Sequence, residues 1–185
     1  MILVRLVAMI SLLLLIPDYG SGQPNSIKPY QRSEWRHWID EDNDCQNLRH
    51  EILIAQSSIP VTFTNNRQCT VYSGSWVGPY TGKSYELASD LDVDHVVPLA
   101  YAHEAGGYEW TFEMKQAFAN DEENLLLVDD GENRSKGASG PSEYLPLESF
   151  RCEYIKIWSR IIRKYGLRVK NNDALVISSY LERCV

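Results

Sequence analysis

The stretch "DLDVDHVVP" (residues 90–98) combines three carboxylates and a histidine with alternating apolar side chains. This period-two pattern predicts a strand that ends near Pro98, because proline cannot donate a hydrogen bond within a sheet. Acidic residues are depleted in strands, so the carboxylates indicate a specific role. Neighbouring side chains point to opposite faces of a strand, but at its end Asp94 and His95 can share one site. We therefore expect a polar site there.

Asp94 and His95 have the chemistry of a hydrolytic site. A carboxylate is a hard oxygen ligand that suits Mg²⁺, and a neutral imidazole is a natural general base near neutral pH. A metal-bound phosphate that faces a histidine-activated water is a common arrangement for phosphodiester hydrolysis. For this pair alone, the alternative is a surface aspartate that caps a turn beside a partly buried histidine.

Two asparagines downstream strengthen the hydrolytic interpretation. Asn124 and Asn133 lie 29 and 38 residues after His95, on either side of the apolar run 125–128. The chain is predicted to be α+β, with a small antiparallel β region and flanking helices. The expected strands are 61–64, 69–76, 91–96 and 124–128, and the expected helices are 33–38, 45–57, 99–106, 110–119, 131–137, 148–165 and 171–183.

These segments resemble the HNH, or His-Me finger, endonuclease superfamily, whose core is a ββα-metal hairpin and helix. "DVDHVVP" is similar to the box that opens the HNH nuclease domain of CRISPR-associated effector nucleases, and "ENRSKG" is similar to the helix that closes it. "RSEWRHW", "CQNLRHEIL" and "FANDEENLLLV" also resemble a secreted branch of HNH proteins. The resemblance covers residues 30–184 and implies a ββα-metal core.

The resemblance implies a role for each residue of the motif. His95 and Asn124 are the catalytic residues, with His95 as general base and Asn124 as a brace for the loop between the strands. Asp94 and Asn133 are the metal ligands, and asparagine rather than histidine at 133 favours Mg²⁺ or Mn²⁺ over Zn²⁺. Apart from the resemblance, strand periodicity places Asp92 on the same face as Asp94, where it is expected to support the hairpin or a metal-bound water. The implied products carry a 5′-phosphate and a 3′-hydroxyl.

An acidic protein needs a local basic surface to bind nucleic acid, and this chain has a net charge of −7. Two residues sit beside the last asparagine of the motif, and three more fall on one face of a predicted helix at i, i+4 and i+7. The predicted substrate-binding residues are Arg134, Lys136, Lys156, Arg160 and Arg163. For both groups of residues, the alternative to substrate binding is that they are ordinary solvated charges on the protein surface.

Residues 1–22 have the layout of a secretory signal peptide, with Arg5, an apolar run over 6–16 and small residues before Gln23. The run is shorter than the ~20 residues that a spanning helix needs, and an uncleaved membrane anchor is the alternative. Cleavage would leave a single nuclease domain, 23–185, with no membrane association. We expect a monomer that is secreted and extracellular, or periplasmic if the source is Gram-negative.

The four cysteines are an even number and lie after the expected cleavage site, which favours disulfide bonds. Three pairings exist, and we favour Cys45–Cys69 with Cys152–Cys184 because each closes a local unit. Each bond is expected to stabilise the fold by ~2–4 kcal/mol. The fold is therefore predicted to be disulfide-stabilised.

The stretch "DEDNDCQNLRHE" (40–51) has acidic residues at the first, third, fifth and twelfth positions, as an EF-hand loop does. Cys45 stands where an EF-hand needs glycine, which argues against a full EF-hand. A looser structural Ca²⁺ site at Asp40, Asp42 and Asp44 is one interpretation. The other is an acidic turn that caps the following helix, where carboxylates suit the helix dipole.

The sequence thus predicts a secreted, metal-dependent endonuclease. DNA is favoured over RNA as substrate, with little sequence preference, because no separate reader module is evident. The competing class is a non-catalytic secreted calcium-binding or adhesion domain on a nuclease-like fold. The complete set of Asp94, His95, Asn124 and Asn133 argues against such a decayed site.

Overall fold

Helices and strands both occur in residues 28–184, the part of the chain that the computed structural model describes. The helices are α1 (Leu48–Gln56), α2 (Leu99–Glu104), α3 (Phe112–Ala119), α4 (Asp130–Lys136), α5 (Arg151–Tyr165) and α6 (Asn171–Arg183). The strands are β1 (Thr62–Phe63), β2 (Val71–Val77), β3 (Ser84–Leu87), β4 (Leu91–His95) and β5 (Leu125–Asp129). This mixture confirms the α+β class. The expected signal peptide lies outside the described residues and stays a prediction.

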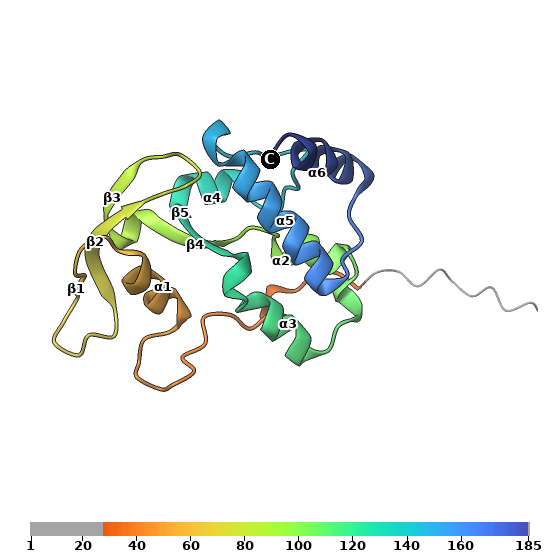
Figure 1. Ribbon diagram of the computed structural model, residues 1–185. Helices are drawn as coiled ribbons and strands as arrows, with labels where there is room; N and C mark the ends of the chain where they lie inside the picture. The colour runs from red at the N-terminus through yellow and green to blue at the C-terminus, as the bar shows by residue number, and fades with distance from the viewer. Residues whose placement is uncertain (1–27, 185) are drawn as a thin grey trace, which may run out of the picture.

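The strands form two antiparallel sheets, one of three strands in the order β1-β2-β3 and one of β4 and β5. The β4–β5 pair is regular from Leu91 opposite Asp129 to His95 opposite Leu125. In Figure 1 this pair lies between an end made of α1 and the three-stranded sheet and an end made of α2, α3, α5 and α6. The predicted site therefore lies at the centre of the molecule.

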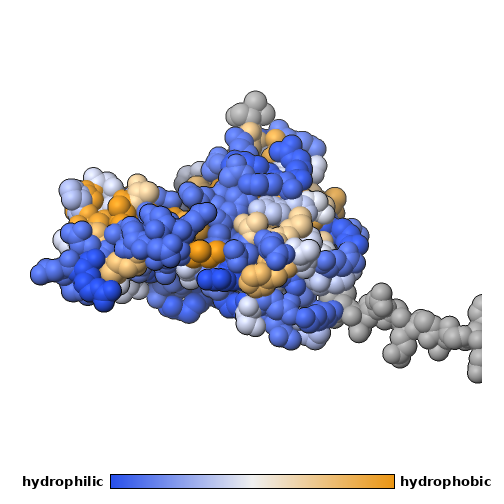
Figure 2. All heavy atoms as spheres, turned by 90° about the horizontal axis from the view of Figure 1, so that it is seen from below, coloured by the Kyte–Doolittle hydropathy of each residue, from blue (hydrophilic) through white to orange (hydrophobic). Residues whose placement is uncertain are grey.

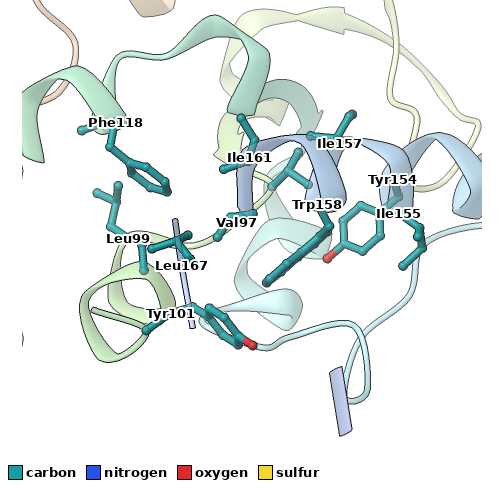
Figure 3. Packing of buried hydrophobic residues seen from close by; sticks show 14 of the residues in the cluster. Val97, Leu99, Tyr101, Phe118, Tyr154, Ile155, Ile157, Trp158, Ile161 and Leu167 are labelled. Atoms are coloured by element: carbon teal, nitrogen blue, oxygen red, sulfur yellow. The ribbon is translucent and has the colours of Figure 1, made fainter. Parts of the chain in front are cut away.

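Two apolar clusters hold these parts together. The larger one packs α2, α3, α5 and α6, and includes Tyr154, Trp158 and Ile161 of α5, which are all fully buried. Figure 3 shows Ile161 and Trp158 beside Val97, with Tyr154 on the other side of Trp158. Val97 lies two residues after the end of β4. The smaller cluster packs α1 against the strands. These α5 side chains therefore belong to the core, and they support the loop after β4.

Two differences from the sequence-based expectations have clear physical reasons. Residues 33–38 form only a 3-10 turn, Arg32–Glu34, because Trp35 turns into the core and Trp38 adopts a left-handed φ of 56°. Strand β3 was not expected. Its side chains are mostly exposed, and it is defined by pairing with β2 rather than by an apolar pattern of its own.

Both expected disulfides are present, Cys45–Cys69 and Cys152–Cys184. The first joins the chain before α1 to the chain before β2, and the second joins α5 to the end of α6. Within residues 28–184, every helix is too short or too polar to span a membrane. Figure 2 shows a mainly hydrophilic face on which hydrophobic side chains form separate small groups.

Candidate active site

A strand–strand–helix unit brings the motif residues together. Asp129 ends β5, and its side chain accepts a hydrogen bond from the backbone N–H of Glu132, which caps α4 directly after the strand. Helix α4 therefore folds back along β4. The amide nitrogen of Asn133 donates to Asp92 at 3.1 Å, across 41 residues of sequence. Asp92 thus supports the hairpin, in the position that strand periodicity predicted for it.

A cleft of about 290 Å³ opens at the end of β4. Asp94, His95 and Asn133 line it together, although Asn133 comes from a different element 38 residues later. The remaining lining residues come from the chain before α1, from β4, from the start of α2 and from the turn after α4: Tyr30, Arg32, Val93, Pro98, Leu99, Ala100, Gly137 and Ala138. The expectation that Asp94 and His95 share one site is met by this geometry.

His95 is held in one tautomer. Its Nε2 lies 2.8 Å from the carbonyl oxygen of Ala119, and a carbonyl only accepts, so Nε2 carries the proton and Nδ1 keeps its lone pair. Burial lowers the pKa of His95 to about 3, and the nearby charge of Arg32 adds a smaller effect in the same direction. The imidazole is therefore neutral at pH 7. A phosphate anion in the cleft would raise this pKa, because it stabilises the imidazolium.

Asp94 is buried and strongly paired. The hydroxyl of Tyr80 donates to its Oδ2 at 2.7 Å, and the ammonium of Lys136 lies 3.0 Å from the same oxygen. Burial raises the pKa of Asp94 and lowers that of Lys136, while their mutual attraction opposes both shifts. A carboxylate has about four lone-pair positions, so Asp94 still has an acceptor position for a ligand in the cleft.

Lys136 does not lie where the sequence-based prediction placed it. The side chain is fully buried, and its ammonium donates to Asp94 and, at 2.9 Å, to the carbonyl oxygen of His95. The prediction that Lys136 contacts substrate phosphate is therefore wrong. The physical reason is that α4 turns this face toward β4. Arg134 points outward instead and pairs with Asp130 at 2.8 Å.

Asn124 is also fully buried and acts as a brace. Its Oδ1 accepts from the backbone N–H of Val97 at 2.8 Å, and its Nδ2 donates to the carbonyl oxygen of Val97 at 3.1 Å. Both amide atoms are thus used within the protein. Asn124 does not line the cleft, so its effect on catalysis would pass through the loop that directly follows His95.

The donors in the cleft fit a hard divalent ion. Asp94 supplies carboxylate oxygen, and Asn133 keeps its Oδ1 available because Asp92 takes the amide N–H. Oxygen donors of this kind suit Mg²⁺ or Mn²⁺ rather than Zn²⁺. A neutral imidazole lies in the same cleft. Asp94 and Asn133 are therefore suitable ligands.

The predicted basic face of α5 lies elsewhere. Lys156, Arg160 and Arg163 are exposed, and none of them is among the residues that line the cleft. Arg160 approaches Glu153 at 3.7 Å, and Arg163 donates to the carbonyl oxygen of Ser159. The structure thus leaves their role in substrate binding as a prediction.

The sequence-based prediction missed several residues beside the cleft. Tyr30 and Arg32 line it, and Tyr80 holds Asp94. The rings of Trp38 and His37 lie 5.7 and 6.2 Å from the ring of His95. The aromatic-rich stretch 30–38 was the available signal, but nothing in its spacing pointed to His95.

A second group of acidic side chains precedes α1. Asp40, Asp42 and Asp44 each offer an oxygen, and these oxygens lie within 4.8 Å of one another. Oδ1 of Asp40 is buried without a hydrogen-bond partner among the described residues. The backbone N–H groups of Asp44, Cys45 and Gln46 donate to these carboxylates, as in an acidic turn. The geometry is compatible with both interpretations of this loop.

Comparison with known proteins gives two matches. The family model described as "GmrSD restriction endonucleases, C-terminal domain" matches residues 34–174. A protein of Arthroderma benhamiae, described as "Uncharacterized secreted protein", is 36% identical over 158 residues, which cover 84% of this chain and 76% of that protein. No solved structure matches the chain.

Proposed function

Because the chain belongs to the family of GmrSD restriction endonuclease C-terminal domains, we propose that it is a secreted, metal-dependent endonuclease of the HNH type. Membership confirms the resemblance to endonucleases. A nuclease family implies a nucleic-acid substrate and a divalent metal ion. The observation that carries the finer proposal is the single cleft in which a neutral His95 lies beside Asp94 and Asn133.

His95 is the proposed general base. Its Nε2–H is held by the carbonyl of Ala119, so Nδ1 is the atom that can take a proton from an attacking water. Asn124 fixes the loop after β4 through Val97, which supports the chain directly after His95. The pair of Lys136 and Asp94 holds the end of β4 against α4.

Asp94 and Asn133 are the proposed ligands of Mg²⁺ or Mn²⁺. When bound, the ion would supply positive charge that stabilises the phosphate and the leaving oxygen. Asp92 orients the amide of Asn133 by accepting its N–H. Products with a 5′-phosphate and a 3′-hydroxyl are part of this proposal.

DNA is the proposed substrate in preference to RNA, with little sequence preference. Secretion is supported by the apolar N-terminal segment of the sequence and by the description of the Arthroderma benhamiae relative. Lys156, Arg160, Arg163 and Arg134 remain candidates for contacts outside the cleft. We propose that the mature protein, 23–185, is a monomeric single domain.

A structural Ca²⁺ ion at Asp40, Asp42 and Asp44 stays a prediction, supported by the convergence of three carboxylates. If it binds, added Ca²⁺ should raise the unfolding temperature of the wild type but not that of an Asp42→Asn, Asp44→Asn double variant. Cleavage with Mg²⁺ should persist in that variant. A non-catalytic calcium-binding or adhesion domain would instead give the Ca²⁺ shift without any cleavage.

The proposed function is tested with supercoiled plasmid and purified mature protein. Cleavage is expected with Mg²⁺ or Mn²⁺, and it should disappear with EDTA or with His95→Ala. His50→Ala is the matched control, because His50 is a half-buried histidine on α1 that does not line the cleft. Equal cleavage by wild type and His95→Ala, or no cleavage with any divalent ion, would overturn the proposal. RNA offered in parallel tests the sugar preference.

A further inference from the structure

The motif residues offer the cleft no uncommitted cationic side chain. Lys136 is buried and committed to Asp94. Among the described residues that line the cleft, the one cationic side chain is that of Arg32, which comes from the chain before α1. We propose that Arg32 binds the phosphate of the substrate and that His37 positions its guanidinium. This inference rests on the proposed function and adds the residue that holds the substrate.

The guanidinium of Arg32 is free to bind an anion. The side chain is exposed, and within residues 28–184 no carboxylate lies within ion-pairing distance of it. A guanidinium has five N–H donors in a planar fork, which matches two oxygens of a phosphate. An unpaired arginine beside His95 is therefore a suitable phosphate ligand in a protein whose net charge is −7.

His37 can hold Arg32 only in one tautomer, and the structure defines it. Nδ1 of His37 lies 2.8 Å from the carbonyl oxygen of Trp35, so Nδ1 carries the proton. Nε2 then has a lone pair, and it lies 3.3 Å from Nη2 of Arg32, which donates to it. Burial, together with the charge of Arg32, lowers the pKa of His37 and keeps it neutral at pH 7. His37 accepts one hydrogen of the fork, and the side chain of Tyr30 also interacts with the guanidinium, which leaves further N–H groups for phosphate.

The segment that carries Arg32 is firmly attached. Trp35 is fully buried in the larger core, and the carboxylate of Glu34 lies 2.7 Å from the ammonium of Lys115 on α3. The ring of His37 also packs edge-on at 6.2 Å from that of His95. Arg32 is therefore fixed relative to the proposed base, as positioning of a reacting phosphate requires.

Arg32 is tested by binding in a protein that cannot cleave. In the His95→Ala background, Arg32→Ala should weaken binding of a short fluorescent DNA duplex by about tenfold to a hundredfold, as loss of charge-assisted hydrogen bonds would. The slope of log affinity against log salt should fall by about one. Arg36→Ala is the matched control, an exposed arginine of the same segment outside the cleft lining. Equal affinity and slope in the two variants would overturn the inference.

His37 is tested by rescue in cleavage-competent protein. His37→Ala should raise KM for plasmid DNA with a smaller effect on kcat, because Arg32 loses its fixed position. His37→Gln should recover much of the loss, since an amide oxygen can accept the hydrogen bond of Arg32. Equal loss in both variants, or no loss in His37→Ala, would exclude this positioning role.

These results separate the two proposals. If the wild type cleaves but Arg32→Ala binds and cleaves like Arg36→Ala, the Arg32 inference fails and the proposed nuclease function stands. If the wild type cleaves nothing with any divalent ion, the nuclease function fails, and duplex binding still tests Arg32. Absence of duplex binding by the His95→Ala protein would overturn the Arg32 inference.

Discussion

The ammonium of Lys136 lies 3.0 Å from the carboxylate of Asp94, and both groups are buried. This pair joins the first helix after the hairpin to the end of β4, where His95 is placed. Burying two charges is costly, and the pair also uses Tyr80 and the carbonyl oxygen of His95 to satisfy its hydrogen bonds. The pair therefore couples the stability of the fold to the geometry of the cleft.

Replacing Lys136 with methionine should strongly destabilise the protein. Asp94 would be left as a buried charge without a counter-ion, which costs about 3–5 kcal/mol. Adding Asp94→Asn should restore part of this loss, because the uncompensated charge is removed. Urea denaturation measures both effects, with the exposed Arg134→Met on the same helix as control. Equal unfolding free energies for Lys136→Met and Arg134→Met would contradict the prediction.

Asn124→Ala should leave the N–H and C=O of Val97 without partners. Each unpaired buried group costs about 1–3 kcal/mol. The loop that directly follows His95 should also shift, so kcat should fall. Asn124→Asp should be destabilised too, since an ionised carboxylate cannot donate to the carbonyl of Val97. Denaturation and plasmid cleavage measure the two effects. Glu122→Ala, an exposed neighbour, serves as control, and an Asn124→Ala protein as stable as that control would refute the brace.

The ion pair of Glu34 should make stability depend on pH in acid. Hydrogen bonds from Lys115 and Lys28 lower the pKa of Glu34 to about 2. Because this folded-state pKa lies below the ordinary value, its contribution is present above pH about 4.5 and is lost as pH falls toward 2. Glu34→Gln should therefore be less stable than wild type near pH 7 and should approach it near pH 2. Urea denaturation at several pH values measures the difference in unfolding free energy between Glu34→Gln and wild type. A difference that stays constant from pH 7 to pH 2 would contradict this prediction.

Removing either disulfide should cost about 3–4 kcal/mol, as expected for closed loops of 24 and 32 residues. Paired Cys45→Ser, Cys69→Ser and paired Cys152→Ser, Cys184→Ser variants measure the two contributions separately by denaturation. Neither bond contacts the cleft, so kcat should persist in protein that remains folded. Unchanged stability on removing a pair would argue against this role.

The central hairpin could be predicted from sequence because its signals are local. Alternation over 91–96, the break at Pro98 and the apolar run 125–128 identify two strands, and the short helix follows them. The disulfide pairing was also predictable, since each bond closes a compact local unit. Strand β3 could not be predicted from the sequence, because its exposed side chains lack an apolar pattern and only its pairing with β2 defines it.

Local sequence patterns were enough to predict the α+β class and the order of strand, strand and helix, because strand and helix periodicities follow from backbone geometry. The resemblance to HNH endonucleases, rather than periodicity, implied that Asn133 joins Asp94 and His95. Which cationic side chains border the cleft depends instead on tertiary packing. Lys136 is buried against Asp94, 42 residues earlier, while Arg32 reaches the cleft from a segment outside the hairpin. The sequence shows which side chains are charged. Whether such a side chain is exposed depends on the groups that distant segments of the chain place around it.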